Sequence, residues 1–323
     1  MVACVVIRTN VLATALALDF AIGDPLWLPH PVRAIGAAVT ACDRISRDCN
    51  IREDPVWGRI AGVVTTVTIV GASYGITRAL VQKTGRVGTA LETILAASAL
   101  AWRSLIDEAA SVELSLVIGD VPRARERLAR IVGRDTQNLN ESEIARATIE
   151  TLAESFCDGI VAPLCYLIVG GAPLALAYKA ANTLDSMIGH KEAPYRAFGW
   201  FAARFDDAAN FVPARLSALA IIAASSLALG KSSQSLQICM RDSRLHRSPN
   251  AGWPEAAIAG ALGVRLGGSN TYGGEKVTTP FLGPEFRVPN SQDVRRARNV
   301  ICLAAALIAG TALALLKARD VFH

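Results

Sequence analysis

The feature that most limits how this chain can fold is a series of long apolar segments. Apart from Asp19 and Glu92 they carry no charge, and they are residues 9–22, 60–77, 87–102, 159–178, 216–230 and 300–316. A helix of about 20 apolar residues crosses a bilayer core. We therefore expect an all-α polytopic integral membrane helical bundle of about five to six spans, forming a single domain over residues 1–323.

The first apolar segment follows Arg8 close to the N-terminus, as the apolar part of a signal peptide would. No small-residue cleavage site follows it, and the segment runs directly into Gly23-Asp24-Pro25. We expect a retained first span that carries Asp19 near one end.

The polar stretches between the apolar segments indicate how the chain is oriented. Residues 23–59, 103–158 and 231–299 are rich in arginine, so the positive-inside rule predicts long cytoplasmic loops. Residues 179–215 are equally polar, although simple alternation of spans would place them on the opposite side. We therefore expect the active site to face the cytoplasm.

The segment before residues 179–215 is interrupted by helix-breaking residues, namely Pro163, Gly170, Gly171 and Pro173. Two short apolar halves could re-enter the membrane from the same side, and broken backbone at membrane depth is typical of segments that line a cavity. A re-entrant hairpin would also keep residues 179–215 in the cytoplasm. The alternative is an ordinary kinked span.

Cysteines and net charge exclude several other classes. The seven cysteines are scattered without a C-x-x-C pair, so we interpret them as reduced packing residues. The net charge of +5 is spread over loops, without the basic and aromatic stripe that indicates nucleic-acid binding.

The first polar motif, Gly23 to Arg33, leaves the first span with three prolines, which predict a stiff extended loop. Such a loop would hold Asp24, His30 and Arg33 at the membrane surface, or it could be a structural turn.

The second polar motif begins at Asn140, a plausible helix N-cap with Glu143 at the capping-box position. Arg146, Glu150 and Glu154 follow at spacings of four, so Arg146 can pair with Glu150. Glu150 and Glu154 repel each other at that spacing, which favours a cation between them. The alternative interpretation is that both lie on a solvated helix face. Upstream, the turn of Gly133, Arg134 and Asp135 suits a phosphate or Mg²⁺.

The third motif runs from Asn182 through Asp185 and Ser186 to Asp206, Asp207, Asn210 and Arg215. Asp206 and Asn210 share a helical face, as oxygen ligands of Mg²⁺ could. Asp207 could instead pair with Arg204 or Arg215.

The fourth motif starts at Ser248 and contains Asn250 and Glu255, followed by a glycine-rich segment that ends near Tyr272. Its backbone N–H groups could hold a phosphate or lie against a flat ligand. We expect no strand before it, which argues against a dinucleotide-binding motif. Residues 225–232 resemble the end of a Walker A loop, but Ser225 occupies the leading glycine position.

Taken in order, these motifs resemble one protein family. They are G-D-P, P-H-P-V-R-x-I-G, G-R-D-T, R-A-x-I-E-x-x-A-E, N-T-L-D-S-M-I-G, F-G-W, D-D-x-x-N-x-x-P-A-R and S-P-N-A-G-W-P-E. The series resembles the adenosylcobinamide-phosphate synthase family, CbiB/CobD, from about residue 19 to about residue 275. Ser155 departs from the family pattern, which usually has asparagine there.

The resemblance implies a multi-pass cell-membrane ligase of cobalamin biosynthesis. Such an enzyme joins a corrinoid, adenosylcobyric acid, to (R)-1-amino-2-propanol O-2-phosphate or a related aminoalcohol phosphate, using ATP and Mg²⁺. We expect contact with membrane lipid, no nucleic-acid partner, and leave open an association with other enzymes of the pathway.

The resemblance also suggests residue roles. Catalytic roles fall to Glu150, Glu154 and Asp158, and metal binding to Asp185, Asp206 and Asp207. Substrate and phosphate binding is assigned to polar residues of the same motifs, namely Asp24, His30, Arg33, Arg134, Asp135, Asn182, Ser186, Arg215, Asn250, Glu255 and Tyr272. Two other classes remain: a membrane transporter, and a non-catalytic tether for enzymes of the pathway.

Overall fold

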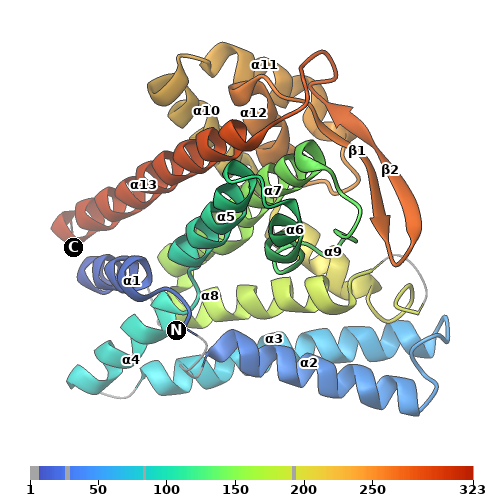
Figure 1. Cartoon of the computed structure of the whole chain (residues 1–323). Coiled ribbons are helices and arrows are strands. Elements are labelled where there is room, and N and C mark those ends of the chain that lie inside the picture. The colour runs from blue at the N-terminus through green and yellow to red at the C-terminus, as the bar shows by residue number, and fades with distance from the viewer. Residues whose placement is uncertain (1–6, 26–29, 83–84, 191–193, 323) are drawn as a thin grey trace. The chain divides into compact units, whose positions relative to one another are not determined.

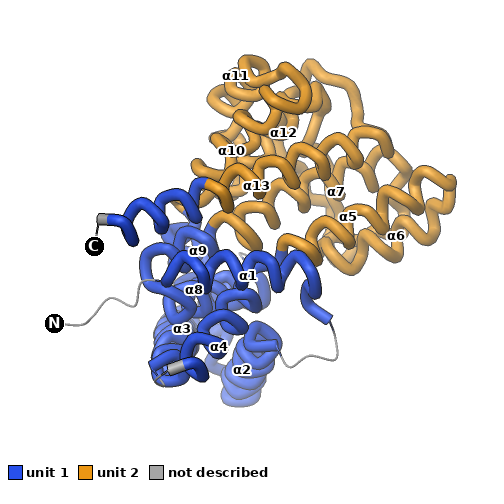
Figure 2. Tube along the Cα trace, turned by 90° about the vertical axis from the view of Figure 1, so that its left-hand side faces the viewer, with its two compact units in different colours: residues 1–101, 162–210, 311–323 blue, residues 102–161, 211–310 orange. Residues whose placement is uncertain are grey.

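A computed structural model describes residues 7–25, 30–82, 85–190 and 194–322 (Figure 1). These residues are predominantly helical, with one antiparallel hairpin, which confirms the predicted helical class. The chain folds into two compact units, shown in blue and orange in Figure 2. Each unit is built from segments that are separated in the sequence.

Unit 1 comprises residues 1–101, 162–210 and 311–323. Its helices are α1 (Thr9–Ile22), α2 (Pro31–Asp48), α3 (Trp57–Val81), α4 (Gly85–Ala97), α8 (Ala162–Ile188) and α9 (Trp200–Ala209). Within this unit α8 packs against α2, α3, α4 and α9.

Unit 2 comprises residues 102–161 and 211–310. Its elements are α5 (Trp102–Val117), α6 (Val121–Ala129), α7 (Glu141–Phe156), a π-helical turn (Cys157–Val161), α10 (Phe211–Leu229), α11 (Ser232–Asp242), a 3-10 turn (Ser243–Leu245), α12 (Gly252–Leu262), β1 (Leu266–Tyr272) and β2 (Glu275–Leu282). Helix α13 (Ser291–Phe322) begins in unit 2 and ends in unit 1.

Four helical stretches of the described chain are long and apolar enough to cross a membrane. They are Trp57–Val81, Glu141–Ile188, Phe211–Leu229 and Ser291–Val321. The chain is thus an all-α polytopic membrane protein, with fewer full-length candidates than the five to six expected. The two expected spans that fall short lie within residues 1–101 of unit 1. Helix α1 has 14 residues and α4 has 13, and both are short for a bilayer core.

The predicted interruption of the fourth apolar segment is present in α8. Gly170 and Gly171 leave helical geometry, with φ/ψ of −145°/19° and 64°/−165°, and Pro173 follows in the next turn. The second pair of angles is open to glycine and strained for other residues. The break divides α8 into two halves, and the re-entrant hairpin stays a prediction.

The segment after α8 folds closely onto α3 in unit 1. Phe198 is buried with Ile69 and Leu184 in one apolar cluster. A Cβ atom at Gly62 would overlap the carbonyl oxygen of Phe198, so only glycine permits this approach. The F-G-W motif therefore anchors the residues between α8 and α9.

Helix α7 begins as the sequence predicts. The Asn140 side chain accepts from the N–H of Glu143, and the Glu143 carboxylate accepts from the N–H of Asn140, so the capping box is complete. Most of the helix is buried, including Arg146 and Glu150. Two charged side chains are thus carried into the interior of unit 2.

The glycine-rich segment differs from the expected loop, because it forms the antiparallel hairpin of β1 and β2. Gly273 and Gly274, both with positive φ, connect Tyr272 to its partner Glu275 in a two-residue turn. A register shift lies between Leu266 and Gly268. The irregularity matters because the backbone there contacts the buried charges of α7.

Candidate functional site

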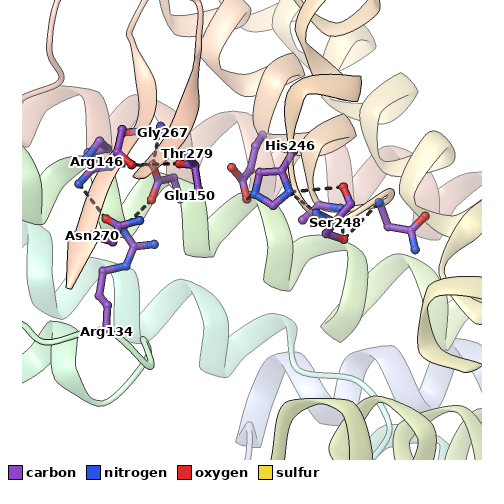
Figure 3. A network of polar contacts seen from close by, with 12 residues as sticks. Arg134, Arg146, Glu150, His246, Ser248, Gly267, Asn270 and Thr279 are labelled. Carbon is purple, nitrogen blue, oxygen red and sulfur yellow. Dashed lines mark hydrogen bonds and ion pairs between the residues drawn. The ribbon is translucent and has the colours of Figure 1, made fainter. Parts of the chain in front are cut away.

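Glu150 of α7 is the centre of a buried polar network in unit 2 (Figure 3). Its carboxylate accepts from Arg134 Nη1 at 2.8 Å and from the N–H of Gly267 at 2.8 Å. Arg146 Nη1 lies 3.6 Å from the same carboxylate, which confirms the predicted pairing at a spacing of four. A buried carboxylate needs such partners to remain ionised.

Asn270 of β1 joins the two arginines of this network. Its side-chain oxygen accepts from Arg134 Nη1 at 2.8 Å and from Arg146 Nη2 at 2.9 Å. Arg146 also donates to the carbonyl oxygens of Gly267 and Ser269. The irregular start of β1 therefore supplies carbonyls that fix the Arg146 guanidinium.

The sequence suggested a cation between Glu150 and Glu154. In the structure the positive charge beside Glu150 comes from Arg134 and Arg146, and Glu154 lies exposed on the same helix. Asp158 is half-buried in the π-helical turn that follows. Turns of this kind occur often at functional sites.

Glu255, in the first turn of α12, is a second buried acid facing this network. Burial raises the pKa of Glu255 well above its usual range, and the charges of Glu150 and Glu154 raise it further. Arg134 and Arg146 act in the opposite direction. Glu255 is therefore an acid that holds a proton more readily than an ordinary glutamate does.

His246 lies beside Glu255, with Nε2 3.7 Å from the Glu255 carboxylate (Figure 3). The N–H of Ser248 donates to His246 Nδ1 at 3.0 Å. This contact makes Nδ1 an acceptor, so a neutral His246 carries its proton on Nε2, which points toward Glu255.

Arg215 and Asn250, both assigned to substrate binding, meet at the start of α10. Arg215 Nη1 donates to Asn250 Oδ1 at 3.1 Å. The guanidinium carbon lies 3.6 Å from the centroid of the Phe211 ring and 4.7 Å from that of Trp253. The aromatic rings orient Arg215 in unit 2.

Asp135 and Tyr272 lie at the hairpin. The Asp135 carboxylate accepts from the N–H groups of Gly273 and Gly274, at 3.2 and 2.8 Å. The Asp135 carboxylate therefore stabilises the two-residue turn of the hairpin, which is a structural role. Tyr272 is 43% exposed at the end of β1, where a ligand could reach it.

In unit 1, Asp206 is buried between two amides. Asn210 Nδ2 donates to it at 3.0 Å and Asn182 Nδ2 lies 3.5 Å away. The Tyr178 hydroxyl donates to Asn210 Oδ1 at 2.9 Å. Asp207 instead pairs with Arg204 at 3.6 Å, the alternative that the sequence left open.

The predicted metal ligands are not assembled into a three-carboxylate site. Within the described part of the chain, no group of three or more His, Cys, Asp or Glu side chains is placed to hold a metal ion. Asp185 is half-buried near the end of α8, and the adjacent Ser186 is exposed. Metal binding by Asp185, Asp206 and Asp207 stays a prediction.

The first motif also differs in part from expectation. Asp24 Oδ1 lies 3.0 Å from His30 Nε2, so these two side chains do meet. Arg33, expected in an extended loop, lies in the first turn of α2, because Pro31 at the N1 position favours a helix start. Residues 26–29 of that motif lie outside the described residues.

Asn270, Gly267 and His246 belong to this network, but the sequence assigned none of them a role, although Asn270 stands out among the glycines of the fourth motif. From the sequence, Arg146 was predicted only to pair with Glu150, because the two residues are four positions apart on one helix. Asn270 stood in a segment interpreted as a glycine-rich loop. The Gly273-Gly274 turn was the available sign that this segment could form a hairpin with inward-pointing side chains.

The comparisons with known proteins agree with this series of motifs. The family model described as CobD/Cbib protein matches residues 12–301. The cobalamin biosynthesis protein CobD of Geobacter metallireducens is 47% identical over 281 residues, covering 86% of this chain and 87% of that protein. The cobalamin biosynthesis protein CbiB of Salmonella typhimurium is 44% identical over 308 residues, covering 94% and 95%. No solved structure matches the chain. With the family model spanning nearly the whole sequence, the chain belongs to the CobD/CbiB protein family.

Proposed function

We propose that this protein acts in cobalamin biosynthesis as an adenosylcobinamide-phosphate synthase. It would form an amide between a carboxylate of adenosylcobyric acid and the amine of (R)-1-amino-2-propanol O-2-phosphate or a related aminoalcohol phosphate, using ATP. The proposal includes the cell membrane as its location and a cytoplasmic active site. Family membership and the buried network around Glu150 carry the proposal together.

The network offers the two kinds of charge that the aminoalcohol phosphate requires. The guanidiniums of Arg134 and Arg146 suit phosphate oxygens, and Glu255 suits an ammonium group. Asn270 fixes both guanidiniums before a substrate arrives. Such preorganisation lowers the cost of holding a doubly charged small molecule.

Amide formation requires that the amine lose a proton before it attacks. Both carboxylate oxygens of Glu150 are already engaged by guanidiniums, those of Arg134 and Arg146, so we do not assign it the proton-accepting role. Glu255 has a raised pKa and faces the same network, so we assign it the proton-accepting role once the ammonium has displaced its own proton. The displaced proton would be released to solvent, and the Nε2–H of neutral His246 would then face the ionised Glu255 carboxylate.

Mg²⁺ and ATP require a different set of residues. Mg²⁺ commonly binds one or two protein carboxylates together with substrate phosphates, and Asp206 beside Asn182 and Asn210 offers one buried carboxylate. The residues therefore fit a magnesium–nucleotide complex better than a resident ion. When bound, Mg²⁺ would neutralise phosphate charge.

A transporter remains the second candidate, because the break at Gly170 and Gly171 is typical of transporter helices that line a substrate path. A tether without turnover is the third. Both predict that the purified protein forms no amide.

The test is mass-spectrometric detection of adenosylcobinamide phosphate after incubation of the purified protein with adenosylcobyric acid, aminopropanol phosphate, ATP and Mg²⁺. We expect product that requires ATP, and none from Arg134→Ala, with Arg130→Ala as the control from the surface of the same loop. Substrate binding without product would favour the tether. Uptake of substrate into vesicles without product would favour the transporter.

A further inference from the structure

Unit 1 contains a pocket that the proposed reaction does not use. It has a volume of about 430 Å³. Its wall comes from the segment around the start of α3 and the segment before α9, with Glu53, Pro55, Arg59, Pro194, Arg196 and Ala197. The pocket thus combines two guanidiniums and one carboxylate at the end of a helix that is long and apolar enough to cross a membrane.

Gly58 brings the two segments of this wall together. A Cβ atom at Gly58 would lie 2.7 Å from the carbonyl oxygen of Arg52 and 3.0 Å from the Cβ atom of Ala197, so α3 begins in direct contact with both. Arg52 Nη1 lies 3.1 Å from the Asp43 carboxylate, which also accepts from the Tyr195 hydroxyl at 3.2 Å. The walls of the pocket are therefore fixed before a ligand binds.

The two arginines of the wall point to an anionic ligand. Arg59 and Arg196 are exposed, and neither forms an ion pair with the side chains that the structure describes. The guanidinium carbon of Arg59 lies 5.6 Å from the centroid of the Trp200 ring, which orients it. Two guanidiniums and the Glu53 carboxylate leave a net charge of +1, which matches the single negative charge of a phosphodiester.

From the level of the pocket onward, α3 presents an apolar stripe. Trp57, Ile60, Val64 and Val67 are each at least 46% exposed, and they follow one another at spacings of three and four, so they share one helical face. On a membrane-spanning helix such a face contacts lipid chains, and a tryptophan at its end is typical of the headgroup level. The guanidiniums of the pocket thus lie at the level of lipid phosphates.

We propose that this pocket binds the headgroup of an anionic phospholipid, phosphatidylglycerol, with its phosphate at Arg59 and Arg196. The glycerol hydroxyls donate to Glu53, and the acyl chains lie along the exposed face of residues 57–67. Phosphatidylcholine fits this wall less well, because its headgroup carries a quaternary ammonium and no hydroxyl donor. The inference does not depend on the proposed synthase reaction.

The test uses the full chain in nanodiscs that contain equal parts of phosphatidylcholine and phosphatidylglycerol. Native mass spectrometry counts the lipids of each class that stay on the protein after release, and titration of phosphatidylglycerol into detergent-solubilised protein gives the affinity. We expect wild type to retain phosphatidylglycerol in preference to phosphatidylcholine. The assay needs neither ATP nor a corrinoid, so its failure is distinct from failure of the synthase assay.

The variants are Arg59→Gln and Arg196→Gln, which each remove one guanidinium from an exposed position and leave the apolar core intact. Arg47→Gln is the matched control, because Arg47 is an exposed arginine at the end of α2 that pairs with Asp48, outside the described wall of the pocket. We expect the affinity for phosphatidylglycerol to fall about tenfold in each pocket variant, consistent with loss of one charge-assisted hydrogen bond, and to stay within about twofold in the control. Equal affinity of wild type and both pocket variants, an equal fall in the control, or no preference of wild type for phosphatidylglycerol would overturn the inference.

Discussion

Asn270 is the single residue on which the geometry of the network depends most directly. Asn270→Ala would leave Arg134 and Arg146 each without one buried hydrogen bond, at a cost of about 1–3 kcal/mol per group. We expect kcat of the synthase reaction to fall by about tenfold or more, because the guanidiniums lose their common acceptor.

The control for Asn270 is the adjacent Ser269→Ala. Among the described residues, the Ser269 hydroxyl has one hydrogen-bond partner, Thr278 Oγ1, in the exposed part of the hairpin. Its backbone carbonyl still accepts from Arg146. Synthase rates should stay within about twofold of wild type, as for surface substitutions in general. If the two variants lose activity equally, the hairpin as a whole is responsible and not the Asn270 side chain.

The raised pKa of Glu255 predicts that the stability of the folded protein depends on pH. Its pKa is raised in the folded protein, so folding favours the protonated form, and its contribution to stability is lost as pH rises from the usual glutamate range through the folded pKa. Glu255→Gln has no proton to lose. The thermal midpoint of this variant should therefore exceed that of wild type increasingly as pH rises, and then level off.

Thermal unfolding in detergent between about pH 5 and pH 9 measures this difference, at about 1.4 kcal/mol for each unit between the folded and unfolded pKa. Glu285→Gln is the control, because Glu285 lies at the surface and its pKa is lowered by a hydrogen bond from Arg241. A constant difference between Glu255→Gln and wild type at every pH would show that Glu255 does not bind its proton more tightly in the folded state.

At the scale of elements, the break in α8 depends on glycine. Gly171 has φ and ψ of 64° and −165°, which other residues adopt only with strain of about 1–3 kcal/mol. Gly171→Ala should lower the thermal midpoint. Gly71→Ala, in the regular helix α3 where nothing lies within 4 Å of an added Cβ, should be neutral or stabilising by up to about 1 kcal/mol. Equal midpoints for the two variants would indicate that α8 straightens at little cost.

The same break bears on how the fourth apolar segment meets the membrane. If its two halves re-enter from one side, a topology tag at residue 192, which lies outside the described residues, should report the cytoplasm together with a tag in residues 103–158. An external position for the first tag alone would establish an ordinary kinked span instead.

Across the whole molecule, sequence alone predicted what depends on local spacing. The capping box at Asn140, the Arg146–Glu150 pair and the interruption of α8 follow from residues close together in the chain. Arg134 meets Glu150 only because the loop between α6 and α7 folds back, and Asn270 joins them through a hairpin more than 100 residues further on. Contacts of this kind depend on tertiary packing, which periodicity does not report.

The number of full-length spans shows the same limit. Hydropathy located the apolar segments, and α1 coincides with the expected residues 9–22, which are themselves short for a bilayer core. Helix ends depend on caps and turns, so α4 ends at Ala97 although its apolar segment continues to residue 102. The hairpin was missed because the sequence of β1 is rich in glycine and poor in β-branched residues. Its pairing is instead favoured by the Gly273-Gly274 turn and by Asp135, which binds that turn.

The measurement that tests the central claim most directly follows a heavy oxygen isotope in the carboxylate of adenosylcobyric acid. In the proposed reaction a carboxylate oxygen bonds to the terminal phosphorus of ATP, ADP leaves, and the amine then displaces phosphate from the acyl carbon. This route predicts one labelled oxygen in the released phosphate for each adenosylcobinamide phosphate formed. Unlabelled phosphate alongside product would contradict this activation step. The absence of product from folded protein that binds its substrates would contradict the synthase assignment itself.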